Sequence, residues 1–163
     1  MILGFVRHGT TEWNKAGRMQ GQLDTDLTDE GREQAARLGK ALRGTPWTGI
    51  VSSDLRRARE TAELIAAHAG IPLLTTDARL REKSFGELEG TTVAERLERW
   101  GENWRALAPG QESDEAVWRV GSIFTSTLFC GNMPGGSCLS SPTARSSAAC
   151  CNSKGWSRRT IRS

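Results

Sequence analysis

The chain has 163 residues, 37% of them hydrophobic, and a formal net charge of +3, which fits one domain of ordinary size with a real core. No stretch approaches the roughly 18 apolar residues of a membrane span, and the start lacks the basic segment of a signal peptide, so we expect a cytoplasmic protein without a membrane partner. From Gly121 onward the chain has basic residues and no acidic ones. The positive charge therefore belongs to the tail, and we expect no nucleic-acid partner.

The first apolar run, Ile2–Val6, predicts a buried strand that stops at Arg7-His8-Gly9. Ligands of open α/β sheets bind beyond the carboxyl ends of strands, which is where this triplet would lie. Thr10 and Asn14 follow within one helical turn. An arginine fork, small neutral donors and a glycine suit an oxyanion, although a single histidine is often only a hydrogen-bonded structural residue.

The next elements alternate between helix and strand. Residues 15–26 predict a loop, and Thr28 predicts the N-cap of a helix that runs through Arg43. Ile50–Ser53 predicts a second strand, followed by a helix that Asp54 caps. We interpret His68, in the last turn of that helix, as structural or exposed. The remaining predictions are a strand at Leu73–Leu74, a helix over Thr91–Ala106 anchored by Leu97, Trp100 and Trp104, and a helix from Ser113.

Arg7-His8-Gly9 with Asn14 resembles the signature of the histidine phosphatase superfamily, also called the phosphoglycerate mutase-like family. Four later stretches extend the resemblance, at Gly17–Gly21, Ser53–Ala62, Leu80–Gly90 and Pro109–Ser113, the last with Gln111 where the family has a glycine. The resemblance implies an α/β fold, specifically a three-layer α/β/α sandwich. It also implies chemistry through a phosphohistidine that requires neither a metal nor an organic cofactor.

The resemblance implies a role for each matching residue. His8 would be the nucleophile, Arg7 and Arg57 would bind the phosphoryl group, and Glu82 would protonate the leaving group. The predicted substrate-binding residues, in addition to the two arginines, are Thr10, Asn14, Gln20 and Gly21. Two neighbouring carboxylates, Glu87 and Glu89, are expected to be solvated or to cap a helix, and two arginines, Arg56 and Arg59, to be solvated.

The resemblance stops in the tail, which divides the chain into a phosphatase-like domain (residues 1–120) and an atypical Ser/Cys-rich segment (residues 121–163). The family's second histidine, in a Ser-His-Gly turn after an aliphatic strand, has no counterpart, because no histidine follows His68. The spacing of the four cysteines matches no zinc site, so we expect no metal.

A shift of reading frame is one hypothesis for the origin of the tail. In the shifted frame, each new codon consists of the third base of one codon and the first two bases of the next. Read in this way, the codons of Gly136–Ser141 can encode an aliphatic run, and those of Ser141 to Ala144 can encode Ser-His-Gly. We favour such a frameshift, beginning near Trp118–Ser122, over a divergent tail. As written, the tail is expected to leave a strand position empty beside Val6 and Ile50, with weak activity and either disorder after Val120 or self-association into a homo-oligomer.

The short interval between Gly90 and Ser113 favours a phosphatase over the longer mutases of this family. We expect a phosphomonoester hydrolase acting on a small phosphorylated metabolite. Two alternatives stay open: a phosphoglycerate mutase, and a catalytically impaired phosphate-binding relic without the second histidine.

Overall fold

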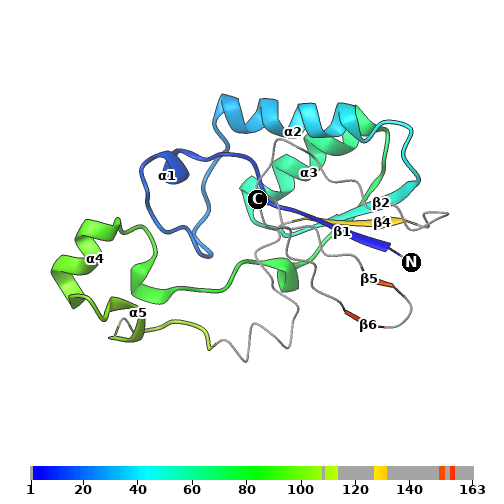
Figure 1. The fold of residues 1–163 in the computed structure, drawn as a ribbon. Coiled ribbons are helices and arrows are strands. Elements are labelled where there is room, and N and C mark those ends of the chain that lie inside the picture. Colours follow the sequence, from blue (N-terminus) through cyan, green and yellow to red (C-terminus); the bar gives the residue numbers. More distant parts are fainter. Residues whose placement is uncertain (1, 108, 114–126, 132–150, 153–154, 157–163) are drawn as a thin grey trace, which may run out of the picture.

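The computed structural model describes residues 2–107, 109–113, 127–131, 151–152 and 155–156. Its centre is a four-stranded sheet with α2 and α3 packed together on one face (Figure 1). The α/β class predicted from the sequence is confirmed, while the helix predicted from Ser113 onward lies outside the described residues. In order across the sheet, the strands are β1 (Ile2–Val6), β4 (Thr127–Gly131), β2 (Trp47–Ser52) and β3 (Leu73–Thr76).

Strand direction places the carboxyl ends of β1, β2 and β3 at one edge of the sheet. β2 and β3 are parallel, and β4 runs antiparallel to both β1 and β2. β1 and β2 therefore point the same way on either side of β4. Segments that leave these three strands consequently meet at one edge, as the sequence analysis expects for a ligand site.

Two helices connect the strands and cover the sheet: α2 (Asp29–Ala41) between β1 and β2, and α3 (Arg56–Ala69) between β2 and β3. The two helices approach each other closely at Gly39 of α2. A Cβ at this position would lie only 2.9 Å from the Ile65 carbonyl oxygen of α3. Below them, Ile50 and Phe129 are fully buried in the sheet, and Trp47 meets Phe129 edge to face at 5.8 Å. This contact between α2, α3 and the sheet is the main hydrophobic core.

The expectation of an empty strand position beside Val6 and Ile50 is wrong. β4 fills it, pairing Phe129 with Ile50 and Thr127 with Val6, and Ile50 is 0% exposed. β4 is not predictable from the sequence, because its apolar stretch is short and lies in a serine-rich region without periodicity. Five residues suffice here because both neighbouring strands satisfy its backbone hydrogen bonds. The proposed Ser-His-Gly region of the shifted frame, residues 141–144, lies outside the described residues.

One predicted helix cap is found in the structure, whereas a second cap and the bounds of one helix differ from the prediction. Thr28 caps α2, since its hydroxyl accepts from the Gly31 N–H. Asp54 does not cap α3, because its carboxylate pairs with Arg81 instead. The single helix predicted over Thr91–Ala106 is two helices that break at Gly101, and the predicted anchor Leu97 is 40% exposed. Their bounds are Val93–Trp100 for α4 and Trp104–Leu107 for α5.

The remaining described elements are short. They are α1 (Glu12–Lys15), the 3₁₀ helices η1 (Ala78–Leu80) and η2 (Gly86–Leu88), and a two-stranded ladder of β5 (Cys151–Asn152) and β6 (Gly155–Trp156). Within the described part of the chain, no helix is long and apolar enough to cross a bilayer.

Candidate active site

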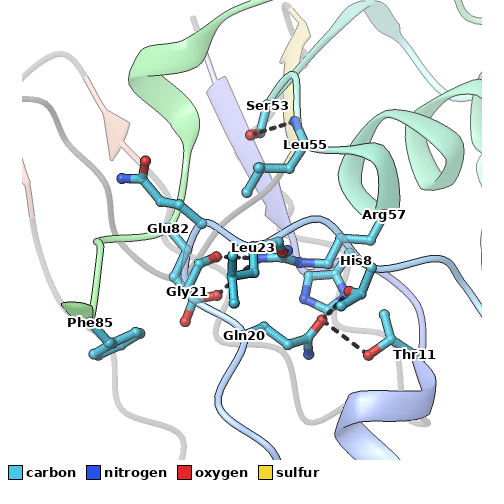
Figure 2. Close-up of polar contacts among 12 residues, drawn as sticks. His8, Thr11, Gln20, Gly21, Leu23, Ser53, Leu55, Arg57, Glu82 and Phe85 are labelled. Atoms are coloured by element: carbon cyan, nitrogen blue, oxygen red, sulfur yellow. Dashed lines mark hydrogen bonds and ion pairs between the residues drawn. The ribbon is translucent and has the colours of Figure 1, made fainter. Parts of the chain in front are cut away.

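The predicted catalytic side chains gather at the carboxyl edge of the sheet. His8 follows β1, Arg57 lies in the first turn of α3 after β2, and Glu82 follows η1 after β3. Figure 2 shows these three side chains beside one another, with Gln20 and the loop of Gly21 and Leu23 lying against them. Residues up to 74 positions apart in the sequence thus form one polar cluster.

A hydrogen bond from the ring to the neighbouring backbone fixes the tautomer of His8. Its Nδ1 lies 2.7 Å from the Gly9 carbonyl oxygen, and because a carbonyl only accepts, Nδ1 carries the proton. In the neutral ring, Nε2 then keeps its lone pair. Burial, opposed by this hydrogen bond and reinforced by the charges of Arg57 and Arg7, lowers the pKa of His8 to about 4. His8 is therefore neutral at physiological pH, the state that a nucleophile requires.

The backbone next to His8 is fixed by α2 and α3. The Gly9 N–H donates to the Thr61 hydroxyl oxygen at 3.1 Å, and the Thr61 hydroxyl donates to the Arg57 carbonyl at 2.7 Å. On the other side, a Cβ at Gly9 would lie 2.4 Å from the Gly31 carbonyl oxygen, so only glycine fits. Thr61, which the sequence analysis did not single out, thus connects the histidine loop to the arginine helix.

Arg57 is a buried cation surrounded by acceptors. Its side chain is 1% exposed. Nη1 donates to the Leu23 carbonyl at 2.8 Å, and Nη2 donates to the Gly21 carbonyl at 2.7 Å and to Glu82 Oε2 at 3.3 Å. The Nε–H is buried without a hydrogen-bond partner among the described residues. The guanidinium is thus fixed in place, with one buried donor that the described residues leave unsatisfied.

Glu82 is suited to hold a proton. Burial raises the pKa of its carboxyl group above the usual value, although the charges of Arg57 and Arg7 and the Arg57 hydrogen bond act in the opposite direction. The net direction is upward because desolvation is the largest effect. A carboxyl group with a raised pKa, next to Arg57, has the properties of a general acid.

The other predicted binding residues divide into two groups. Arg7 is exposed, yet its charge acts on both His8 and Glu82, which places it beside them. Asn14 presents its Oδ1 to the Thr11 N–H at 3.0 Å, and this leaves its NH₂ group to donate elsewhere. Gln20 is likewise held through Oε1, which accepts from the Thr25 hydroxyl at 2.6 Å.

Thr10 and Gly21 have positions that indicate structural roles. The Thr10 N–H and hydroxyl both donate to Gln34 Oε1 at 3.1 Å, which directs this side chain toward α2. Gly21 contributes a backbone carbonyl to Arg57, and its φ of +53° favours glycine. A Cβ there would lie 2.1 Å from Glu89 Oε1, so the Glu89 carboxylate occupies the space beside Gly21.

Several charged residues near the site were predicted to be solvated. This is correct for Arg56, Arg59 and Glu87, which are exposed. For Glu89, predicted to be solvated or to cap a helix, the capping alternative fits: its carboxylate accepts the N–H of Phe85, the N-cap residue of η2, and it also accepts hydrogen bonds from Ser84 and Gln22.

The second histidine of the chain takes no part in the cluster. Nδ1 of His68 lies 2.8 Å from the Leu64 carbonyl within α3, which agrees with its predicted structural role. Among the described residues, no group of three or more His, Cys, Asp or Glu side chains could hold a metal ion.

Comparison with known proteins identifies relatives of two kinds. The chain is 41% identical over 142 residues to a probable phosphoglycerate mutase, GpmB, of Citrobacter koseri, an alignment that covers 81% of this chain and 64% of the relative. It is 50% identical over 119 residues to the glucosyl-3-phosphoglycerate phosphatase of Mycolicibacterium vanbaalenii, covering 71% of this chain and 49% of the relative. The chain thus spans about half to two thirds of the length of these curated relatives.

Solved structures agree with the sequence relatives. The mycobacterial glucosyl-3-phosphoglycerate phosphatase in complex with VO₃ superposes with a TM-score of 0.64 at 38% identity, over 73% of this chain and 62% of the other. YhfR of Bacillus stearothermophilus gives a TM-score of 0.64 at 35% identity, over 73% and 62%. The family model of the histidine phosphatase superfamily (branch 1) matches residues 3–125. The chain therefore belongs to the histidine phosphatase superfamily.

Proposed function

We propose that this protein is a phosphomonoester hydrolase that acts through a phosphohistidine at His8 on a small phosphorylated metabolite in the cytoplasm. The observation that carries the proposal is the cluster at the sheet edge. It combines a neutral imidazole in a fixed tautomer, two arginine charges and a carboxyl group of raised pKa. Arg57 and Glu82 lie 3.3 Å apart, so the phosphate-binding and proton-donating groups adjoin.

In the first step, Nε2 of His8 attacks phosphorus and the bond between phosphorus and the ester oxygen breaks. The charges of Arg7 and Arg57 stabilise the phosphoryl oxygens as their charge is redistributed. Glu82 transfers its proton to the leaving alkoxide, which departs as an alcohol. The products of this step are an alcohol, a phosphorylated His8 and an ionised Glu82.

In the second step, a water molecule attacks the phosphohistidine. The Glu82 carboxylate accepts a proton from this water, and His8 leaves as the neutral imidazole. Phosphate is released, and both groups return to their starting protonation states. The hydrogen bond from Nδ1 to Gly9 keeps the imidazole oriented through both steps.

A phosphoglycerate mutase is the second candidate, and the probable mutase among the relatives favours it. A mutase returns the phosphoryl group from the histidine to a phosphoglycerate hydroxyl, whereas a phosphatase returns it to water. The short interval between Gly90 and Ser113 supports the phosphatase, as does the mycobacterial phosphatase relative. A third possibility, a phosphate-binding relic, follows from the missing second histidine, but a proton donor such as Glu82 would have no use in it.

The test compares wild type with His8→Gln and, as a matched control, His68→Gln, on p-nitrophenyl phosphate and on phosphoglycerates. We expect phosphate release by wild type and by the His68 variant, its loss in the His8 variant, and inhibition by vanadate. Conversion of 3- to 2-phosphoglycerate faster than phosphate release would favour the mutase. The absence of both activities would favour the relic.

A further inference from the structure

Glu89 joins the two segments that hold the catalytic arginine and the proton donor. Its Oε1 accepts the Gln22 N–H at 3.1 Å from one segment. It also accepts the Phe85 N–H at 2.9 Å and the Ser84 hydroxyl at 3.2 Å from the other. Hydrogen bonds to an ionised carboxylate are roughly twice as strong as neutral ones, so this oxygen fastens the segments firmly.

The first segment, Gln20–Leu23, carries the acceptors of Arg57. The Gly21 carbonyl oxygen accepts a hydrogen bond from Nη2 of Arg57 at 2.7 Å, and the Leu23 carbonyl oxygen accepts one from Nη1 at 2.8 Å. Gly21 also makes room for the Glu89 carboxylate, since a Cβ there would lie 2.1 Å from Oε1. Glu89 and Arg57 therefore hold this loop between them.

The second segment carries the proton donor. Ser84 and Phe85 follow Glu82 by two and three residues, and Glu82 contacts Arg57 at 3.3 Å. A shift of this segment would move the donor relative to the loop and the arginine together. Gln22 and Glu89 are 67 residues apart in the sequence, so local chain geometry cannot set the position of one segment relative to the other. The hydrogen bond from the Gln22 N–H to the Glu89 carboxylate does so instead.

We propose that Glu89 is a positioning residue, which sets the distance of the Glu82 carboxyl group from Arg57 by tying Ser84 and Phe85 to the Gln20–Leu23 loop. The inference rests on the proposed function for its kinetic consequence, but not for its geometry. Glu89 touches none of the proposed reacting atoms and acts through Glu82 and Arg57.

Three neighbouring charges influence the pKa of Glu82. Two substitutions of Glu89 can therefore separate the effect of its charge from the effect of the position that it imposes on Glu82. Arg57 on α3 and Arg7 after β1 lower the pKa of Glu82, whereas Glu89 raises it. Glu89→Gln keeps the shape and the acceptor but removes the charge, so the pKa of Glu82 should fall. Glu89→Asp keeps the charge but withdraws the carboxylate by one methylene. Glu82 then loosens from Arg57, which lowers its pKa in the wild type, so the pKa of Glu82 should rise.

The experiment is a carbon-13 NMR titration of glutamate carboxyl groups, with Glu82 assigned by its loss in Glu82→Gln and folding checked by circular dichroism. The matched control is Glu87→Gln, an exposed carboxylate two residues away, which should leave the Glu82 pKa unchanged. Opposite shifts in the two Glu89 variants support the proposal. An unchanged Glu82 pKa in folded Glu89→Asp overturns it, and that variant decides alone if Glu89→Gln does not fold.

The kinetic arm measures wild type and Glu89→Asp on an alkyl phosphate and on p-nitrophenyl phosphate. Misplacing a proton donor should lower kcat on the alkyl phosphate about 10- to 100-fold, with a smaller loss on the nitrophenyl ester. Equal losses on both substrates contradict positioning of Glu82. If wild type itself hydrolyses neither substrate, the proposed function fails, while the titration still decides the role of Glu89.

Discussion

Replacing Arg57 with lysine should damage stability and activity together. The guanidinium spans the carbonyl oxygens of Gly21 and Leu23 and the Glu82 carboxylate, and it presents a buried Nε–H. A lysine keeps the charge, but its single nitrogen cannot reach these three acceptors in the same geometry. Hydrogen bonds to charged groups contribute about 1.5–3 kcal/mol each, so the loss of two predicts a destabilisation of about 3–6 kcal/mol.

The assay is urea unfolding, with hydrolysis of p-nitrophenyl phosphate measured in parallel. Loss of a transition-state donor should lower kcat by about 10²–10³. Arg56→Lys is the matched control, because the Arg56 side chain is exposed and forms a surface ion pair with Asp26, which contributes at most about 1 kcal/mol. The free energy of unfolding of the control should lie within about 1 kcal/mol of the wild-type value. If that of Arg57→Lys does so as well, the assignment of Arg57 as a fixed buried donor is wrong.

Three further predictions concern the proton donor, the pH profile and the tail. Glu82→Gln should slow hydrolysis of alkyl phosphates by about 10²-fold or more but slow p-nitrophenyl phosphate far less, since nitrophenolate scarcely needs a proton; equal losses would argue against this role. Because His8 must be neutral and Glu82 protonated in the free enzyme, kcat/KM should fall below pH 4, where His8 gains its proton, and fall again as pH rises through the raised pKa of Glu82. An acid limb near 6.5 would instead show an unperturbed histidine, and an alkaline limb that persists in Glu82→Gln would belong to another group. For the tail, sequencing the encoding DNA across Glu112–Ser163 should reveal a shifted frame, and restoring Ser-His-Gly should raise turnover about tenfold or more; no gain would contradict the frameshift.

The sequence predicted what depends on local pattern or on family motifs. Ile2–Val6 forms a strand and Thr28 caps a helix, as short-range chemistry predicts. The strand was predicted to be buried, but Leu3 to Val6 are only half-buried, because β1 is the terminal strand of the described sheet and pairs with β4 alone. Arg57 and Glu82 were assigned from the resemblance alone, and the structure brings them together with His8. Their chemical roles remain predictions until they are measured.

What the sequence could not predict depends on contacts between distant residues. Thr61 acts on Gly9 across 52 positions, and Glu89 on Gln22 across 67, so neither partner is visible in the local pattern. Asp54 looked like a helix cap, but a longer-range pair with Arg81 takes its carboxylate. β4 escaped prediction because its place is created by β1 and β2 rather than by its own weak strand signal.

The central claim is that His8 carries the phosphoryl group during turnover. It is tested most directly by mixing the protein with a phosphomonoester, quenching in alkali, where phosphohistidine survives, and locating the phosphate by peptide mass spectrometry. We predict phosphate on the peptide that contains His8, its loss on brief acid treatment, and its absence in His8→Gln. Phosphate on another residue, or turnover without any phosphorylated His8, would contradict this account.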